Sequence, residues 1–105
     1  MPLVLLAGAA LTMSSAAQAG DAAAGRQKAA QVCAVCHGAN GLAVAPETPN
    51  LAGEPEGYIA RQLRAFRSGK RQHEVMAVIA KGLSDEEIDN LAAWFNSIKL
   101  TATVP

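Results

Sequence analysis

The clearest hydrophobic pattern in the chain lies near its C-terminal end, where apolar residues recur at helical spacing. This stripe consists of Ile88, Leu91, Ala92, Phe95 and Ile98, and Trp94 widens it. Ser84 and Glu87 stand just before it at the spacing of an S-x-x-E capping box, which marks a helix N-terminus. The pattern predicts an amphipathic helix that starts at Ser84 and ends near Lys99, followed by a loose tail.

A second helix is expected near the start of the chain, over about 21–36. Asp21 can cap its N-terminus, and the segment that follows is rich in alanine. Gly25 lies inside this helix, where glycine costs about 1 kcal/mol relative to alanine. We interpret Gly25 as a position where another helix crosses closely; the alternative is that glycine is simply tolerated near a frayed helix end.

Two shorter helices are expected between these, over about 56–68 and 73–80. The apolar positions of the former recur at i, i+4 and i+7 and are Ile59, Leu63 and Phe66. Gly69 follows it, as is typical of a helix C-terminus. The stretch 38–57 is rich in glycine and proline and is expected to be a loop, and no segment has a convincing strand pattern. The sequence thus predicts an all-α fold of about four short helices.

The first nineteen residues are interpreted as a secretion signal. An apolar run over 3–11 is shorter than the roughly 20 residues that span a bilayer, and Ala17-Gln18-Ala19 forms an A-x-A cleavage site. No Lys or Arg precedes the run, so either the natural start lies upstream or the terminal amine supplies the positive charge. We expect cleavage after Ala19, a mature domain over 20–105, export to the periplasm and no stable membrane insertion, rather than an uncleaved anchor.

Charge is balanced, with nine Lys and Arg against nine Asp and Glu, and nothing indicates nucleic-acid binding. Arg61, Arg64 and Arg67 recur on one face of the helix expected over 56–68, and Lys70 and Arg71 follow. We interpret this arginine stripe as a solvated helix face. The alternative is a docking patch for an acidic protein partner.

The strongest chemical signal is the run from Cys33 to His37, which reads C-A-V-C-H. C-x-x-C-H is the attachment signature of a c-type haem. The two thiols add across the two vinyl groups of the haem, and two residues on a helical turn set the sulfurs about one haem edge apart. His37 is then aimed at the iron from one side, and the covalent haem gives a small chain a large apolar body to pack against.

C-x-x-C also occurs in structural disulfides, thiol–disulfide enzymes and zinc sites. A zinc site needs four ligands, and the only other histidine, His73, has no second Cys or His beside it. A thioredoxin-like enzyme would show a βαβ pattern, which is missing from the sequence. Covalent haem is therefore the preferred interpretation.

Met76 is the predicted second axial ligand of the iron. It is the only methionine outside the expected signal, and it lies in an apolar stretch, whereas His73 lies among polar residues. A thioether favours ferrous iron and raises the reduction potential. The alternative role for Met76 is core packing, and His73 and, less so, Lys81 are the rival ligands.

Together these residues resemble the bacterial class I cytochromes c, of the small c553 type or one half of a dihaem cytochrome c4. The resemblance runs from Gly25 through the C-x-x-C-H motif, the segment 48–53, Met76 and the helix that carries Trp94. It implies that the carbonyl group of Pro49 accepts a hydrogen bond from His37 and that Leu51 packs on the haem.

The function that follows is a periplasmic electron carrier that holds one haem c between His37 and Met76. Such a protein exchanges electrons with redox donors and acceptors, performs no bond chemistry and is expected to be a monomer. The alternative is a haem-bearing subunit of a larger periplasmic oxidoreductase, and a thiol–disulfide oxidoreductase is the less favoured third.

Overall fold

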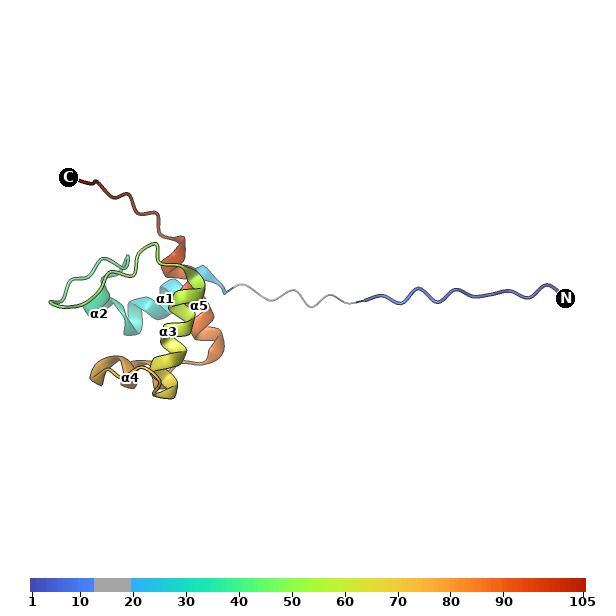
Figure 1. The fold of residues 1–105 in the computed structure, drawn as a ribbon, viewed down its shortest axis with the longest axis horizontal. Helices are drawn as coiled ribbons and strands as arrows, with labels where there is room; N and C mark the ends of the chain where they lie inside the picture. Colours follow the sequence, from blue (N-terminus) through green and yellow to red (C-terminus); the bar gives the residue numbers. More distant parts are fainter. Residues whose placement is uncertain (13–19) are drawn as a thin grey trace.

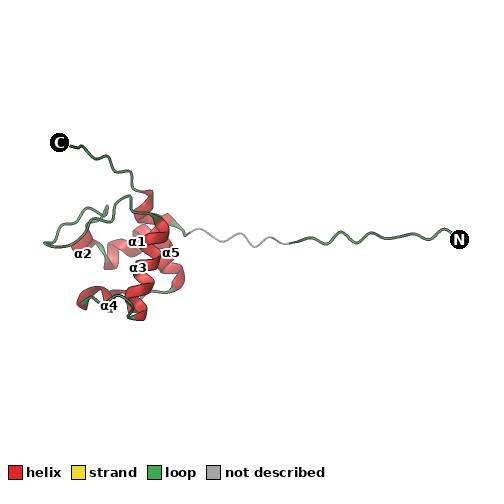
Figure 2. Ribbon diagram, in the orientation of Figure 1, coloured by secondary structure: helices red, strands yellow, loops and turns green. Residues whose placement is uncertain are grey.

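The computed structural model describes residues 1–12 and 20–105, and this part of the chain contains five helices and no strand (Figures 1 and 2). The helices are α1 (Ala22–Val32), α2 (Ala34–His37), α3 (Glu56–Ser68), α4 (Glu74–Lys81) and α5 (Asp85–Ser97). The all-α prediction is confirmed. The expected cleavage site at 17–19 lies outside the described residues, and none of the described helices is long and apolar enough to cross a bilayer.

Helices α1 and α5 cross at Gly25. Asp21 caps α1, since its side chain accepts hydrogen bonds from the backbone N–H groups of Ala23 and Ala24 at 2.9 and 3.1 Å. A Cβ atom added to Gly25 would lie 1.9 Å from the carbonyl oxygen of Asn90 on α5. The close crossing predicted from this glycine is therefore present, and a glycine is needed there because the two backbones touch.

The expected continuous helix over 21–36 is wrong, because α1 ends at Val32 and the chain resumes as the single turn α2. Cys33, between them, has a φ of −114° and leaves regular helical geometry. The carbonyl oxygen of Cys36 accepts a hydrogen bond from the N–H of Val44 in the following loop, at 3.0 Å. This non-local bond ties the turn to the loop, and the structure therefore has five helices where four were expected.

The other helix ends follow the local signals. Gly69 ends α3 with a φ of 84°, in the left-handed region where glycine is favoured. Ser84 and Glu87 form the predicted capping box, with hydrogen bonds of 3.0 and 3.1 Å between each side chain and the other residue's N–H. His73 precedes α4 as its cap rather than its first residue.

The core lies between α1, α3 and α5, where Ile88, Leu91 and Phe95 are the largest fully buried side chains. The predicted α5 stripe supplies these residues, and Trp94 and Ile98 pack at its edge. The loop over 38–55 is pinned to the end of α5 by the N–H of Gly53, which donates to the carbonyl of Phe95 at 2.9 Å. The core thus joins α1, α3 and α5 into one packed unit.

Candidate haem site

A cavity of about 450 Å³ opens between α2, the loop, α3 and α4, with α5 at its base. Its volume falls within the usual range for small-molecule sites, roughly 300–1,000 Å³. All six residues that the sequence assigned to the cofactor line it: Cys33, Cys36, His37, Pro49, Leu51 and Met76. Residues from three separate segments of the chain are thus brought to one place.

The walls of the cavity are largely apolar. The apolar side chains come from α1, α3, α4 and α5 and include Val32, Ile59, Leu63, Phe66, Ile79, Leu91 and Phe95. Apolar walls suit the flat, hydrophobic face of a porphyrin, and they exclude water from any charge held there.

His37 is buried, with 8% of its surface exposed, and its Nδ1 lies 2.9 Å from the carbonyl oxygen of Pro49. A carbonyl oxygen only accepts, so this contact requires the proton to sit on Nδ1. In the neutral ring, Nε2 then has a free lone pair, which is the form in which imidazole binds a metal. The Pro49 carbonyl thus fixes both the tautomer and the orientation of the ring.

The environment of Cys33 disfavours thiol–disulfide chemistry. Burial raises the pKa of its thiol to about 11, and the positive charge of Lys28 offsets only part of that rise. Thiols that exchange disulfides at neutral pH have lowered pKa values. A half-buried thiol on the wall of an apolar cavity is placed instead to form a permanent bond to an apolar group.

The candidate sixth ligands differ in their surroundings. Met76 is half-buried on the first turn of α4 and lines the cavity. His73 also lines it, but its Nδ1 accepts a hydrogen bond from the N–H of Met76 at 3.2 Å and caps α4. Lys81 stands exposed at the far end of α4, away from the cavity lining.

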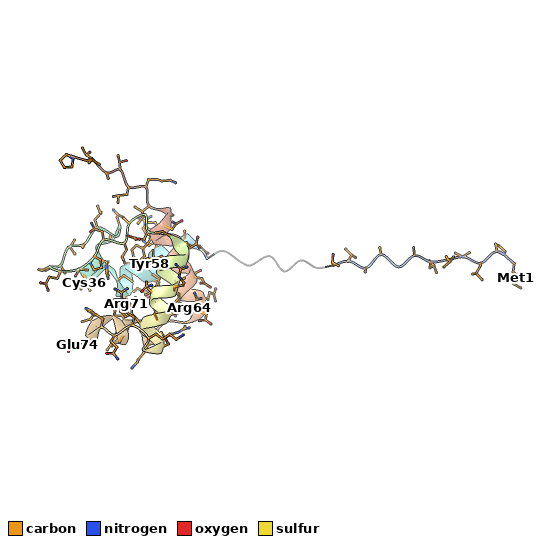
Figure 3. The ribbon with its side chains drawn as sticks, viewed as in Figure 1. Met1, Cys36, Tyr58, Arg64, Arg71 and Glu74 are labelled. Carbon is orange, nitrogen blue, oxygen red and sulfur yellow. The ribbon has the colours of Figure 1, made fainter. Side chains whose placement is uncertain are left out.

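Sequence reasoning missed a polar group on the cavity wall. Tyr58 and Gln62 lie one turn apart on α3, and Arg71 follows that helix, and all three line the cavity. Figure 3 shows Tyr58 and Arg71 on the part of the molecule that carries Cys36, whereas Arg64 lies on the other side of α3. The i, i+4 spacing of Tyr58 and Gln62 is a signal that could have located this group.

The arginine stripe is not a free solvated face. Arg64 pairs with Asp89 of α5 at 2.9 Å, and Arg67 pairs with Asp85. The hydrogen bond and the positive charge of Arg67 lower the pKa of Asp85 below its usual value. Two of the three arginines of the stripe therefore tie α3 to α5, whereas Arg61, Lys70 and Arg71 take part in none of the ion pairs of the described residues.

The donor set fits a covalently bound haem. Two cysteines stand at C-x-x-C spacing beside a buried imidazole with a free Nε2, and a thioether lies elsewhere on the wall of the same apolar cavity. The described residues hold no cluster of three or more His, Cys, Asp or Glu side chains that would suggest a bare metal ion. These features define a haem-binding electron-transfer domain.

Comparison with known proteins gives the family. The family described as cytochrome c matches residues 22–99, and the chain belongs to it. The cofactor of this family is haem c, joined covalently, and members of the family transfer electrons through it.

Named relatives agree with this assignment. The chain is 46% identical to cytochrome c4 of Pseudomonas aeruginosa over 79% of its own length and 41% of the relative's. It is 43% identical to cytochrome c-554(548) of Halomonas halodenitrificans, over 75% of the chain and 98% of that protein. It is 47% identical to a thiosulfate dehydrogenase electron acceptor of Stutzerimonas stutzeri, over 86% of the chain and 44% of that protein.

The fold matches solved structures as well. Reduced recombinant cytochrome c4 from Pseudomonas stutzeri superposes with a TM-score of 0.71 at 39% identity, over 77% of this chain and 47% of that one. The cytochrome c fold expected from the sequence is confirmed. The chain thus spans less than half the length of its cytochrome c4 and electron-acceptor relatives, and nearly all of cytochrome c-554(548).

Proposed function

We propose that this chain is a periplasmic single-haem electron carrier whose iron is held between His37 and Met76. The observation that carries the proposal is that both side chains line the one cavity beside which Cys33 and Cys36 stand. The haem, when bound, supplies a one-electron ferrous/ferric couple and no bond chemistry. With both axial positions filled by the protein, no substrate binds the iron.

Each side chain has a distinct role in this proposal. Cys33 and Cys36 hold the cofactor through thioether bonds, and Pro49 keeps His37 in the tautomer that presents Nε2. Leu51, half-buried on the cavity wall, packs on the haem. Met76 supplies a soft, uncharged ligand that favours the ferrous state.

His73 is the weaker candidate for the sixth position. Its Nδ1 already caps α4, and its ring lies edge-on to Phe66, with the ring centroids 6.3 Å apart. These contacts give His73 a structural task next to Met76 and support methionine as the ligand. The proposal extends to a monomer that exchanges electrons with other redox proteins, and to removal of residues 1–19 on export.

The second candidate function is that of a haem-bearing subunit of a larger oxidoreductase. The similarity to a thiosulfate dehydrogenase electron acceptor favours it. The two functions use the same haem site and differ in whether a catalytic protein stays bound. Purification from the native host at moderate salt separates them, since a stable catalytic partner would co-elute with the subunit and not with the free carrier.

Carbon monoxide tests the filled coordination shell. The reduced holoprotein is expected to show no spectral change with carbon monoxide at neutral pH, because Met76 occupies the position where the gas would bind. Rapid formation of an adduct would show that the iron has an open site and would overturn the six-coordinate carrier.

A further inference from the structure

We propose that His73 is a positioning residue for the iron site: it fixes the end of α4 that carries Met76, and it withdraws itself from competition for the iron. This inference rests on the proposed function, in which Met76 is the sixth ligand. The Nδ1 atom of His73 accepts a hydrogen bond from the backbone N–H of Met76 at 3.2 Å and caps α4. The capping side chain is thus bonded to the backbone of the proposed ligand itself.

The two ends of α4 are held differently. At the C-terminal end, Ala80 and the following Leu83 are buried, and the carbonyl oxygen of Leu83 accepts a hydrogen bond from Arg67 of α3 at 3.2 Å. At the N-terminal end, Val75 is exposed. The end that carries Met76 therefore depends more heavily on its cap for a fixed position.

The ring of His73 connects this end of α4 to α3. It lies edge-on to the ring of Phe66, with the centroids 6.3 Å apart and the ring planes at 71°. Phe66 is itself buried, and the guanidinium of Arg71 lies over its ring, 4.6 Å from the centroid. Because Phe66 is held in place on α3, its contact with His73 helps to keep Nδ1 directed at the backbone of α4.

The same hydrogen bond decides what the other ring nitrogen of His73 can do. Nδ1 accepts through its lone pair, so in the neutral ring the proton sits on Nε2. A protonated Nε2 has no lone pair for iron, although His73 lines the cavity. The arrangement in His37 is the reverse, because its Nδ1 lies against the carbonyl oxygen of Pro49 and its Nε2 is free. One histidine is therefore prepared to bind iron, and the other to hold Met76.

Loss of the cap should make the sulfur of Met76 easier to displace. Imidazole is a good ligand for haem iron, and in this protein it must displace Met76 before it can bind. The test is a titration of the ferric holoprotein with imidazole at pH 8, followed by the visible spectrum. We expect His73→Ala to bind imidazole about fivefold more tightly than wild type, which is the change in equilibrium constant that loss of one N-cap corresponds to. An unchanged affinity in His73→Ala would overturn the proposal.

Ser84→Ala is the matched control. It also removes an N-cap, but from α5, which carries none of the proposed iron ligands. It should destabilise the fold and leave the affinity for imidazole at the wild-type value. An equal gain in affinity in the two variants would mean that general loosening of the fold exposes the iron, and it would overturn a specific role for His73.

Two further variants separate the cap from the ring. Asparagine is a strong N-cap residue, so His73→Asn should return the affinity for imidazole towards the wild-type value. His73→Phe keeps an aromatic ring but has no hydrogen-bond acceptor, and it should bind imidazole as tightly as His73→Ala. The reverse order would show that ring packing alone holds Met76 and would overturn the proposal. This pair decides the question even if His73→Ala yields too little holoprotein.

Failure of the proposed function would show separately, in the wild type. A ferric wild-type spectrum without a sulfur-to-iron charge-transfer band, or a reduced wild type that binds carbon monoxide, would show that Met76 is not the ligand. With the band present and the reduced iron closed to carbon monoxide, the imidazole titrations test the role of His73 alone.

Discussion

The crossing of α1 and α5 and the cavity side of the molecule use apolar residues in opposite ways. At the crossing, Gly25 lets two backbones touch, and Ile88 and Ala92 are completely buried by other protein atoms. On the cavity side, α4 packs chiefly on α3, and its Val75 and Val78 are 54% and 70% exposed. At the crossing, apolar surface packs against other parts of the same chain. On the cavity side, apolar surface is left available for a cofactor and for other molecules.

The largest effect is expected on the cavity side, from Met76→Ala. Haem should stay attached through Cys33 and Cys36, but loss of the thioether removes the ligand that favours ferrous iron. We expect the potential to fall by more than about 59 mV, a tenfold change in a one-electron equilibrium constant. Potentiometric titration measures this, and the reduced variant should also bind carbon monoxide.

Val78→Ala is the control for that variant. It shortens an exposed apolar side chain on the same helix, outside the cavity lining, and should leave the potential unchanged. If Met76→Ala kept the wild-type reduction potential while His73→Gln had a much lower or higher one, His73 would be the ligand and the assignment of Met76 would be wrong.

At the crossing, Gly25→Ala should lower stability without moving the potential. The added Cβ would meet the carbonyl oxygen of Asn90, and neither backbone can move without disturbing the core. Overpacking of this kind should lower the free energy of unfolding by about 3 kcal/mol. Guanidinium unfolding of the holoprotein measures this free energy.

Gly82→Ala provides the matched comparison. Its φ is −82°, and its new Cβ would make only an ordinary contact, 3.6 Å from the carbonyl oxygen of Ile79. We expect its free energy of unfolding to stay within about 0.5 kcal/mol of wild type. An equal loss of unfolding free energy in the two alanine variants would mean that the contact between α1 and α5 at Gly25 has no room requirement beyond that of an ordinary glycine position.

The smallest effect concerns the ion pairs between α3 and α5. Arg67 lowers the pKa of Asp85 in the folded protein, so the folded state binds a proton there more weakly than the unfolded chain. The pair therefore adds stability at neutral pH and loses it as the pH falls from the usual Asp pKa of about 4 through the lower folded value. Arg67→Gln should be slightly less stable at pH 7 and indistinguishable from wild type in acid or in high salt, by urea unfolding. A difference that persisted in acid would come from the bond between Arg67 and the Leu83 carbonyl instead.

Local signals in the sequence predicted much of the helical framework. The capping box at Ser84 and the helix end at Gly69 depend on residues only a few positions apart in the sequence. The crossing at Gly25 could be predicted because glycine has no side chain and so permits a close approach of two backbones. The C-x-x-C-H motif and Met76 were singled out from residue type and setting, and the structure places them around one cavity.

Features that depend on non-local contacts were not predicted. The break at Cys33 accompanies a hydrogen bond between Cys36 and Val44, and nothing in the local sequence marks it. Arg71 looked like an extension of the arginine stripe, because its direction depends on Gln62 and Phe66, nine and five residues earlier in the chain. The pairing of Arg64 and Arg67 required knowing that α5 lies beside α3.

The central claim is that Met76 completes a site begun by the C-x-x-C-H motif, and the near-infrared spectrum of the oxidised wild-type holoprotein tests it most directly. A ferric haem with one histidine and one methionine shows a sulfur-to-iron charge-transfer band in this region. The account predicts that band in the wild type. A spectrum typical of two nitrogen ligands, or of an open high-spin iron, would contradict it.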